Sequence, residues 1–224
     1  MTARLRLALL DCDGTLVDSQ HSIVAAMTAA WAAFGLGEPD ANAVRRAVGL
    51  PVVAAVARLL PDRPAAEHEA IGTRYREAFF ELRQSGDLQE PLYPGVADAL
   101  DAMQAGGLLL GIATGKSRRG LVATLERHGL LDRFVTLQTA DDGPGKPNPH
   151  LAQQAIAEAG VGAADAVMIG DTVFDMEMAR AAGLHALGVA WGYHDTMELR
   201  DAGAHAIADR FADVPSLVTT LVGG

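Results

Sequence analysis

The stretch "LALLDCDGTLVDS", residues 7–19, places two aspartates, Asp11 and Asp13, directly after a continuous apolar run. Apolar character without alternation is typical of a parallel strand whose two faces are both covered by other elements. Two neighbouring carboxylates disfavour each other's ionisation, so the pair requires a compensating positive charge. The rest of the chain is expected to supply that charge.

Similar apolar runs recur along the second half of the sequence, at residues 108–114, 134–139, 166–171 and 185–191. Helical patterns lie near or between them, at residues 96–106, 117–129, 148–160 and 173–183. Each helical pattern stops at or near a glycine, as helix C-termini prefer. This alternation of strands and helices predicts an α/β fold with a mostly parallel sheet.

The segment from about residue 19 to residue 84 breaks this rhythm, because it has helical patterns such as 22–35 and 65–84 and no convincing strand. A cluster of glycine, proline and acidic residues at 85–95 then returns the chain to the alternating region. We therefore expect a helical cap domain, residues 17–91, inserted into a core formed by residues 1–16 and 92–224.

Composition narrows the class of protein. Half of the 224 residues are apolar, which is enough for a packed core. The 18 Lys and Arg against 28 Asp and Glu give a net charge of −10 with no basic stripe, which argues against nucleic acid as a partner. The single cysteine, Cys12, excludes an internal disulfide and a thiolate zinc site. No apolar run reaches the ~20 residues that span a bilayer, so we expect a cytoplasmic protein without a membrane partner.

Polar residues that can carry out chemistry follow several of the apolar runs. They are Asp11 and Asp13 in "DCDGT", Thr114 in "IATGK", Lys146 in "GPGKPNP", and Asp171 and Asp175 in "IGDTVFDM". Ligands of open α/β sheets bind beyond the carboxyl ends of the strands, which is where most of these residues are expected. Lys146 is the candidate for the compensating charge, because the surrounding prolines stiffen its loop; Lys116 is the competing candidate.

Phosphoryl transfer gives each of these residues a role. Asp11 would attack phosphorus to form an aspartyl-phosphate, and Asp13 would protonate the leaving oxygen and later deprotonate water. Asp171 would add a ligand for a hard divalent cation, most simply Mg²⁺. Thr114 and Lys146 would hold the remaining phosphate oxygens.

These motifs, in this order, resemble the four motifs of the haloacid dehalogenase superfamily of hydrolases, and the resemblance covers essentially the whole chain. It implies a Rossmann-like core, a mobile cap, dependence on Mg²⁺ and an aspartyl-phosphate intermediate. In that scheme Asp11 and Asp171 bind the metal by side chain and Asp13 by its backbone carbonyl, while Asp175 orients the metal shell and Lys146. "DGTLVDS" and "VGLP", residues 48–51, are similar to the phosphoglycolate phosphatase-like branch.

Several other functions use some of the same residues. Dehalogenases of this superfamily lack the second aspartate, so Asp13 favours phosphate chemistry. Phosphosugar mutases of the β-phosphoglucomutase kind carry a histidine early in the cap, where this chain has Ile23 with His21 close by. A mutase is therefore disfavoured but stays an alternative, as does hydrolysis of pyrophosphate. A phospho-acceptor signalling module combines similar residues but needs no helical insert.

The sequence therefore predicts a Mg²⁺-dependent phosphatase that acts on a small phosphorylated metabolite. The residues of the cap that select this substrate are not indicated. Arg45, Arg46 and Arg58 could meet a second acidic group of a substrate, but exposed arginines on a helix are commoner, and they stay unassigned.

Overall fold

The computed structural model describes residues 4–223, and its core is a six-stranded parallel sheet in the order β3-β2-β1-β4-β5-β6. The strands are β1 Arg6–Leu10, β2 Leu108–Ala113, β3 Thr136–Gln138, β4 Ala166–Gly170, β5 His185–Val189 and β6 Ala206–Ala208. β1 lies at the centre, where Leu10 is in register with Ile112 of β2 and Ile169 of β4. The quoted stretch therefore forms the middle of the sheet.

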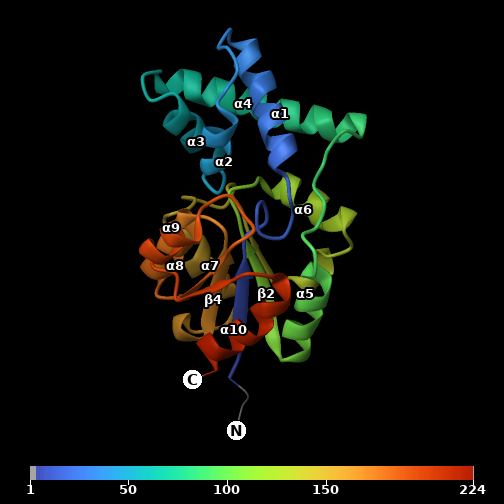
Figure 1. Ribbon diagram of the computed structural model, residues 1–224, viewed down its shortest axis with the longest axis vertical. Helices are drawn as coiled ribbons and strands as arrows, with labels where there is room; N and C mark the ends of the chain where they lie inside the picture. The colour runs from blue at the N-terminus through green and yellow to red at the C-terminus, as the bar shows by residue number, and fades with distance from the viewer. Residues whose placement is uncertain (1–3, 224) are drawn as a thin grey trace.

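Helices cover both faces of this sheet (Figure 1). On one face, Leu7 and Leu9 of β1 belong to a hydrophobic cluster with residues of α7 His150–Ala159, α8 Val173–Ala182 and α9 Thr196–Asp201. On the other face, Ala8 and Leu10 belong to a cluster with residues of α5 Val96–Ala105, α6 Arg118–Arg127 and α10 Val214–Val222. Since successive side chains of a strand point to opposite faces, both sets must be apolar. This explains the unbroken apolar run of β1.

Four further helices lie beyond the carboxyl ends of the strands, at one end of the molecule (Figure 1). They are α1 Gln20–Ala33, α2 Ala41–Arg46, α3 Val52–Leu59 and α4 Ala65–Ser85. They share a separate hydrophobic cluster, in which Met27 and Trp31 of α1 pack with Val56 of α3 and Ile71 of α4. The helical insert therefore has its own core.

The two chain segments that connect these helices to the sheet run side by side. Val17 forms an isolated antiparallel bridge with Leu92. The backbone N–H of Asp18 donates to the carbonyl of Pro91 at 2.8 Å, and that of Tyr93 donates to the carbonyl of Leu16 at 3.0 Å. The chain thus leaves and re-enters the core at one place, which supports our proposal that residues 17–91 form a cap domain on a core of residues 1–16 and 92–224.

The predicted fold class is confirmed: a Rossmann-like parallel α/β core carries an inserted set of helices. The strand expected over residues 134–139 is shorter, since β3 covers only Thr136–Gln138. β6, α9 and α10 were not predicted. β6 has only three residues, and α10 is rich in valine and threonine, whose branched side chains lower helix propensity. Among the described residues, no helix is long and apolar enough to cross a membrane.

Packing on both faces of β1 predicts a large cost for truncating a residue of either face. Leu9 is fully buried, whereas Leu5, just before the strand, is 50% exposed. We expect Leu9→Ala to lower the free energy of unfolding by about 2–5 kcal/mol, as for other buried leucines. Leu5→Ala, the matched control, should change it by less than about 1 kcal/mol. Urea unfolding followed by circular dichroism measures both, and equal effects would contradict the burial of the face of β1 that carries Leu9.

Candidate active site

Lys146 is a fully buried lysine that lies between two carboxylates. Its Nζ is 2.9 Å from Oδ2 of Asp11 and 2.5 Å from Oδ1 of Asp175. Asp11 directly follows β1, Asp175 lies in the first turn of α8, and Lys146 lies in the loop between β3 and α7. Burial disfavours the ammonium ion, but the charges of Asp11 and Asp175 outweigh it and raise the pKa of Lys146 above its usual value. Lys146 therefore stays charged and joins three distant segments at the carboxyl edge of the sheet.

Asp171, at the end of β4, completes a cluster of acids with Asp11 and Asp175. One carboxylate oxygen from each of the three lies within 4.8 Å of the others. Asp171 accepts hydrogen bonds from Oγ1 of Thr15 at 2.8 Å and from the backbone N–H of Tyr193 at 3.0 Å. A side chain at Gly192 could not fit, because its Cβ would lie 2.0 Å from Cβ of Asp171. The backbone at Gly192 and Tyr193 therefore packs directly against the side chain of Asp171.

The charges of this cluster do not balance. Burial raises the pKa of Asp11 to about 7 against the opposing charge of Lys146, and the neighbouring Asp175 adds to the rise. Burial also raises the pKa of Asp171 well above its usual value, helped by the charges of Asp175 and Asp11. Three buried carboxylates share one ammonium ion, and all their ligand atoms are oxygens. These residues fit a hard divalent cation such as Mg²⁺.

Asp175 is oriented by the start of α8. Thr172 caps this helix, and its Oγ1 and backbone N–H donate to Oδ2 of Asp175 at 2.7 and 3.0 Å. Oδ1 of Asp175 is left to face Lys146. Gly170 permits this arrangement, because a Cβ there would lie 2.3 Å from Cγ of Asp175. The capping box therefore fixes the carboxylate that holds the buried lysine.

Asp13 belongs to a second charged cluster. Its Oδ1 accepts hydrogen bonds from Oγ of Ser19 at 2.7 Å and from Nζ of Lys116 at 2.8 Å. Lys116 also donates to Oε1 of Glu90 at 2.7 Å. The two candidate lysines thus have different partners, since Lys146 contacts Asp11 and Lys116 contacts Asp13. Glu90 was missed from the sequence, because it lies in a stretch of polar, glycine and proline residues that is typical of an exposed linker.

A cavity of about 620 Å³ lies between the helical insert and the core. Asp11, Asp13 and Thr114 line it from the core, together with Lys116. The insert contributes mainly apolar and aromatic side chains, among them Ile23, Met27, Tyr75, Phe79 and Phe80. The structure therefore brings the predicted residues of two strand ends to one cavity, and Lys146, Asp171 and Asp175 join them through Asp11.

The arginines of this cavity are not those that the sequence suggested. Arg76, Arg83 and Arg119 contribute to its lining. By contrast, Arg46 is paired with Glu198, and the guanidinium of Arg58 lies over the ring of Phe174. Helix periodicity alone could not have shown which arginines face the core, because that depends on how the insert sits on the sheet.

Comparisons with known proteins agree with this geometry. Residues 8–189 match the family of haloacid dehalogenase-like hydrolases. The chain is 34% identical to the probable phosphatase IndB of Dickeya dadantii, over 93% of this chain and 91% of that protein. It is 28% identical to a phosphoglycolate phosphatase of Nitrosococcus oceani, over 98% and 99% of the two chains.

A solved structure from Clostridium acetobutylicum, described as a predicted phosphatase, shares the fold with a TM-score of 0.88. The two are 23% identical, and the match covers 98% of this chain and 100% of that one. The chain belongs to the haloacid dehalogenase-like hydrolase family. The prediction of a hydrolase of this family is therefore confirmed.

The raised pKa values predict how stability depends on pH when no divalent cation is present. Asp11, with a pKa of about 7, and Asp171 keep protons in the folded protein that the unfolded chain, with an aspartate pKa of about 3.9, has released. The free energy of unfolding should therefore fall as pH rises from about 4 to about 7. Asp171→Asn, which keeps the shape and removes one buried charge, should flatten this decline and stabilise the protein near pH 7.

Thermal unfolding in a chelator across this pH range is the measurement. Asp62→Asn, at an exposed position, controls for the loss of one negative charge. If Asp171→Asn unfolds with the same pH dependence as the unaltered protein, the acid cluster does not carry the excess negative charge.

Proposed function

We propose that the protein is a Mg²⁺-dependent phosphatase that hydrolyses a small phosphomonoester through an aspartyl-phosphate formed on Asp11. The observation that supports this most directly is the position of Asp11, which lines the cavity and is paired with the buried Lys146. A carboxylate nucleophile must approach an anionic ester, and such an approach needs nearby positive charge. The names of the relatives, probable phosphatase and phosphoglycolate phosphatase, point to the same reaction class.

In the first step, a carboxylate oxygen of Asp11 attacks phosphorus while the bond between phosphorus and the ester oxygen breaks. The protonated carboxyl group of Asp13, which also lines the cavity, gives its proton to the departing oxygen, so that an alcohol leaves. In the second step, the ionised Asp13 takes a proton from water, and the resulting hydroxide attacks phosphorus. This releases inorganic phosphate and restores the carboxylate of Asp11.

The remaining residues support these two steps. Lys146 favours the ionised form of Asp11 against the burial that raises its pKa, and it offsets the charge of the phosphate oxygens. Asp175 holds Lys146 in place. The Oγ1 of Thr114, at the end of β2, would donate to a phosphate oxygen. Mg²⁺, bound by Asp11 and Asp171, would screen the phosphate charge from the nucleophile.

The environment of Ile23 favours hydrolysis over phosphosugar transfer. Ile23 is buried and lines the cavity, whereas His21 is exposed on α1. The position at which a mutase would carry its histidine is therefore apolar here. The relatives make phosphoglycolate the first ester to test, with pyrophosphate as the next candidate.

A screen of phosphorylated metabolites, with and without Mg²⁺, tests the proposal. We expect repeated, Mg²⁺-dependent release of phosphate, and Asp11→Asn should abolish it because an amide cannot act as the nucleophile. Unfolding curves check that this variant folds. One stable phosphate per chain without turnover would instead indicate a signalling module, and full turnover by Asp11→Asn would remove Asp11 as the nucleophile.

Asp13→Asn should reduce turnover without abolishing it. The variant keeps the size of the side chain but cannot exchange the proton, and the loss of such a group typically slows a reaction by about 10²-fold or more. The rate at saturating substrate, measured for one phosphomonoester, is the readout. An unchanged rate would mean that the leaving oxygen receives its proton from another group.

A further inference from the structure

Lys116 lines the cavity and contacts three parts of the molecule. Its Nζ is 2.8 Å from Oδ1 of Asp13 in the core and 2.7 Å from Oε1 of Glu90, which lies in the linker between α4 and α5, residues 86–95. It also lies 4.9 Å from the ring centroid of Phe79 on α4 of the insert. Its side chain is only 8% exposed, so these partners, and not water, determine where the ammonium group lies.

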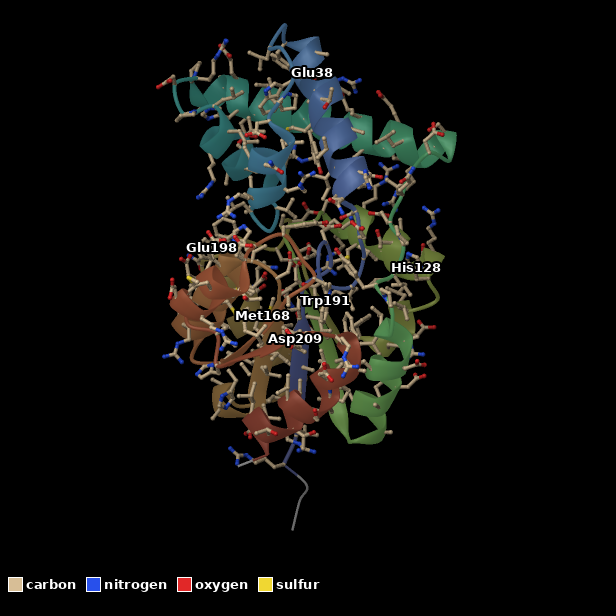
Figure 2. The ribbon with its side chains drawn as sticks, in the orientation of Figure 1. Glu38, His128, Met168, Trp191, Glu198 and Asp209 are labelled. Atoms are coloured by element: carbon tan, nitrogen blue, oxygen red, sulfur yellow. The ribbon has the colours of Figure 1, made fainter. Side chains whose placement is uncertain are left out.

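Glu90 is itself held firmly. Its side chain is fully buried, and Oε2 accepts a hydrogen bond from Oγ1 of Thr124 on α6 at 3.1 Å. A ring nitrogen of His128 lies 2.8 Å from its backbone carbonyl; Figure 2 shows His128 on the side of the core formed by α6. Arg83 makes a longer contact of 3.4 Å with Oε2. Apolar residues of similar volume can often replace a buried ion pair such as Lys116–Glu90 without loss of stability. Stability therefore does not explain Glu90 well, and the position that it gives to Lys116 explains it better.

The contacts of Lys116 orient the carboxyl group of Asp13, because the two oxygens of this group have different hydrogen-bond partners. Oδ1 receives both the hydroxyl of Ser19 and the ammonium of Lys116. Within residues 4–223, Oδ2 of Asp13 has no hydrogen-bond partner, and Asp13 lines the cavity. Two donors on one oxygen fix the rotation of the carboxyl group, and so Oδ2 is the oxygen that is left for a ligand.

We propose that Lys116, anchored by Glu90, is a positioning residue that fixes Oδ1 of Asp13 so that Oδ2 exchanges the proton with the leaving oxygen. This inference rests on the proposed function, in which Asp13 is the proton donor. Lys116 does not contact the reacting atoms in this role. Without it, Ser19 alone holds the carboxyl group, which can then rotate away from the productive geometry.

Two esters whose leaving groups differ in their need for a proton distinguish the positioning of Asp13 from a general effect of Lys116 on binding or folding. An alkyl phosphate has a poor leaving group, so its hydrolysis depends on a proton from Asp13. p-Nitrophenyl phosphate releases a stable phenolate, so its hydrolysis hardly depends on that proton. We expect Lys116→Met to lower kcat/KM for the best alkyl phosphate of the screen at least ~10-fold more than for p-nitrophenyl phosphate, since acid catalysis is worth about 10²-fold or more. Glu90→Gln should shift the ratio in the same direction by a smaller factor.

Arg118→Met is the matched control, because Arg118 lies two residues further along, is exposed and pairs with Asp142. It should leave the ratio of the two kcat/KM values unchanged. An equal loss on both esters in Lys116→Met, or no loss, would overturn the proposal. If Lys116→Met does not fold, Glu90→Gln decides in the same way. Failure of the proposed function is distinguishable, since the unaltered protein would then release phosphate from neither ester.

Discussion

The buried ion pairs of Lys146 with Asp11 and Asp175 are the interaction on which the site depends. An ammonium ion without exposure to water is tolerated only when carboxylates lie against it, and a carboxylate at that depth likewise needs the ammonium. Each residue therefore requires the others to be in place. Because they come from the end of β1, the loop after β3 and the first turn of α8, the correct site forms only when the sheet is assembled in its parallel order.

The site divides its charges between two lysines that have separate tasks. Lys146 pairs with Asp11, which lies among the acids of the cluster. Lys116 pairs with Asp13, two residues further along the chain. Cys12, which lies between Asp11 and Asp13, is buried in the hydrophobic cluster of the core and separates the two carboxylates along the chain. Two aspartates that would repel each other in a simple turn are thus held in different surroundings.

This arrangement is built at the expense of stability. Burial and the neighbouring carboxylates raise the pKa values of Asp11 and Asp171, and apolar residues of similar volume are often at least as stable as such buried charges. Such a trade between stability and activity is common at functional sites. The two-faced core under the site and the separate hydrophobic cluster of the insert carry the fold, so the polar cluster does not need to.

The sequence by itself determined the α/β class, the inserted helices and the group of Asp11, Thr114, Lys146 and Asp171, because unbroken apolar runs and the residues that follow them are local features. The sequence favoured Lys146 as the compensating charge, whereas only the tertiary structure decided that Lys116 pairs with Asp13, because these two residues lie far apart in the chain. The tertiary structure also decided that Glu90 is buried and that Arg76 and Arg119, in place of Arg46 and Arg58, face the cavity. These facts depend on how the helical insert and its linker sit on the sheet, and that placement comes from contacts between residues far apart in the chain.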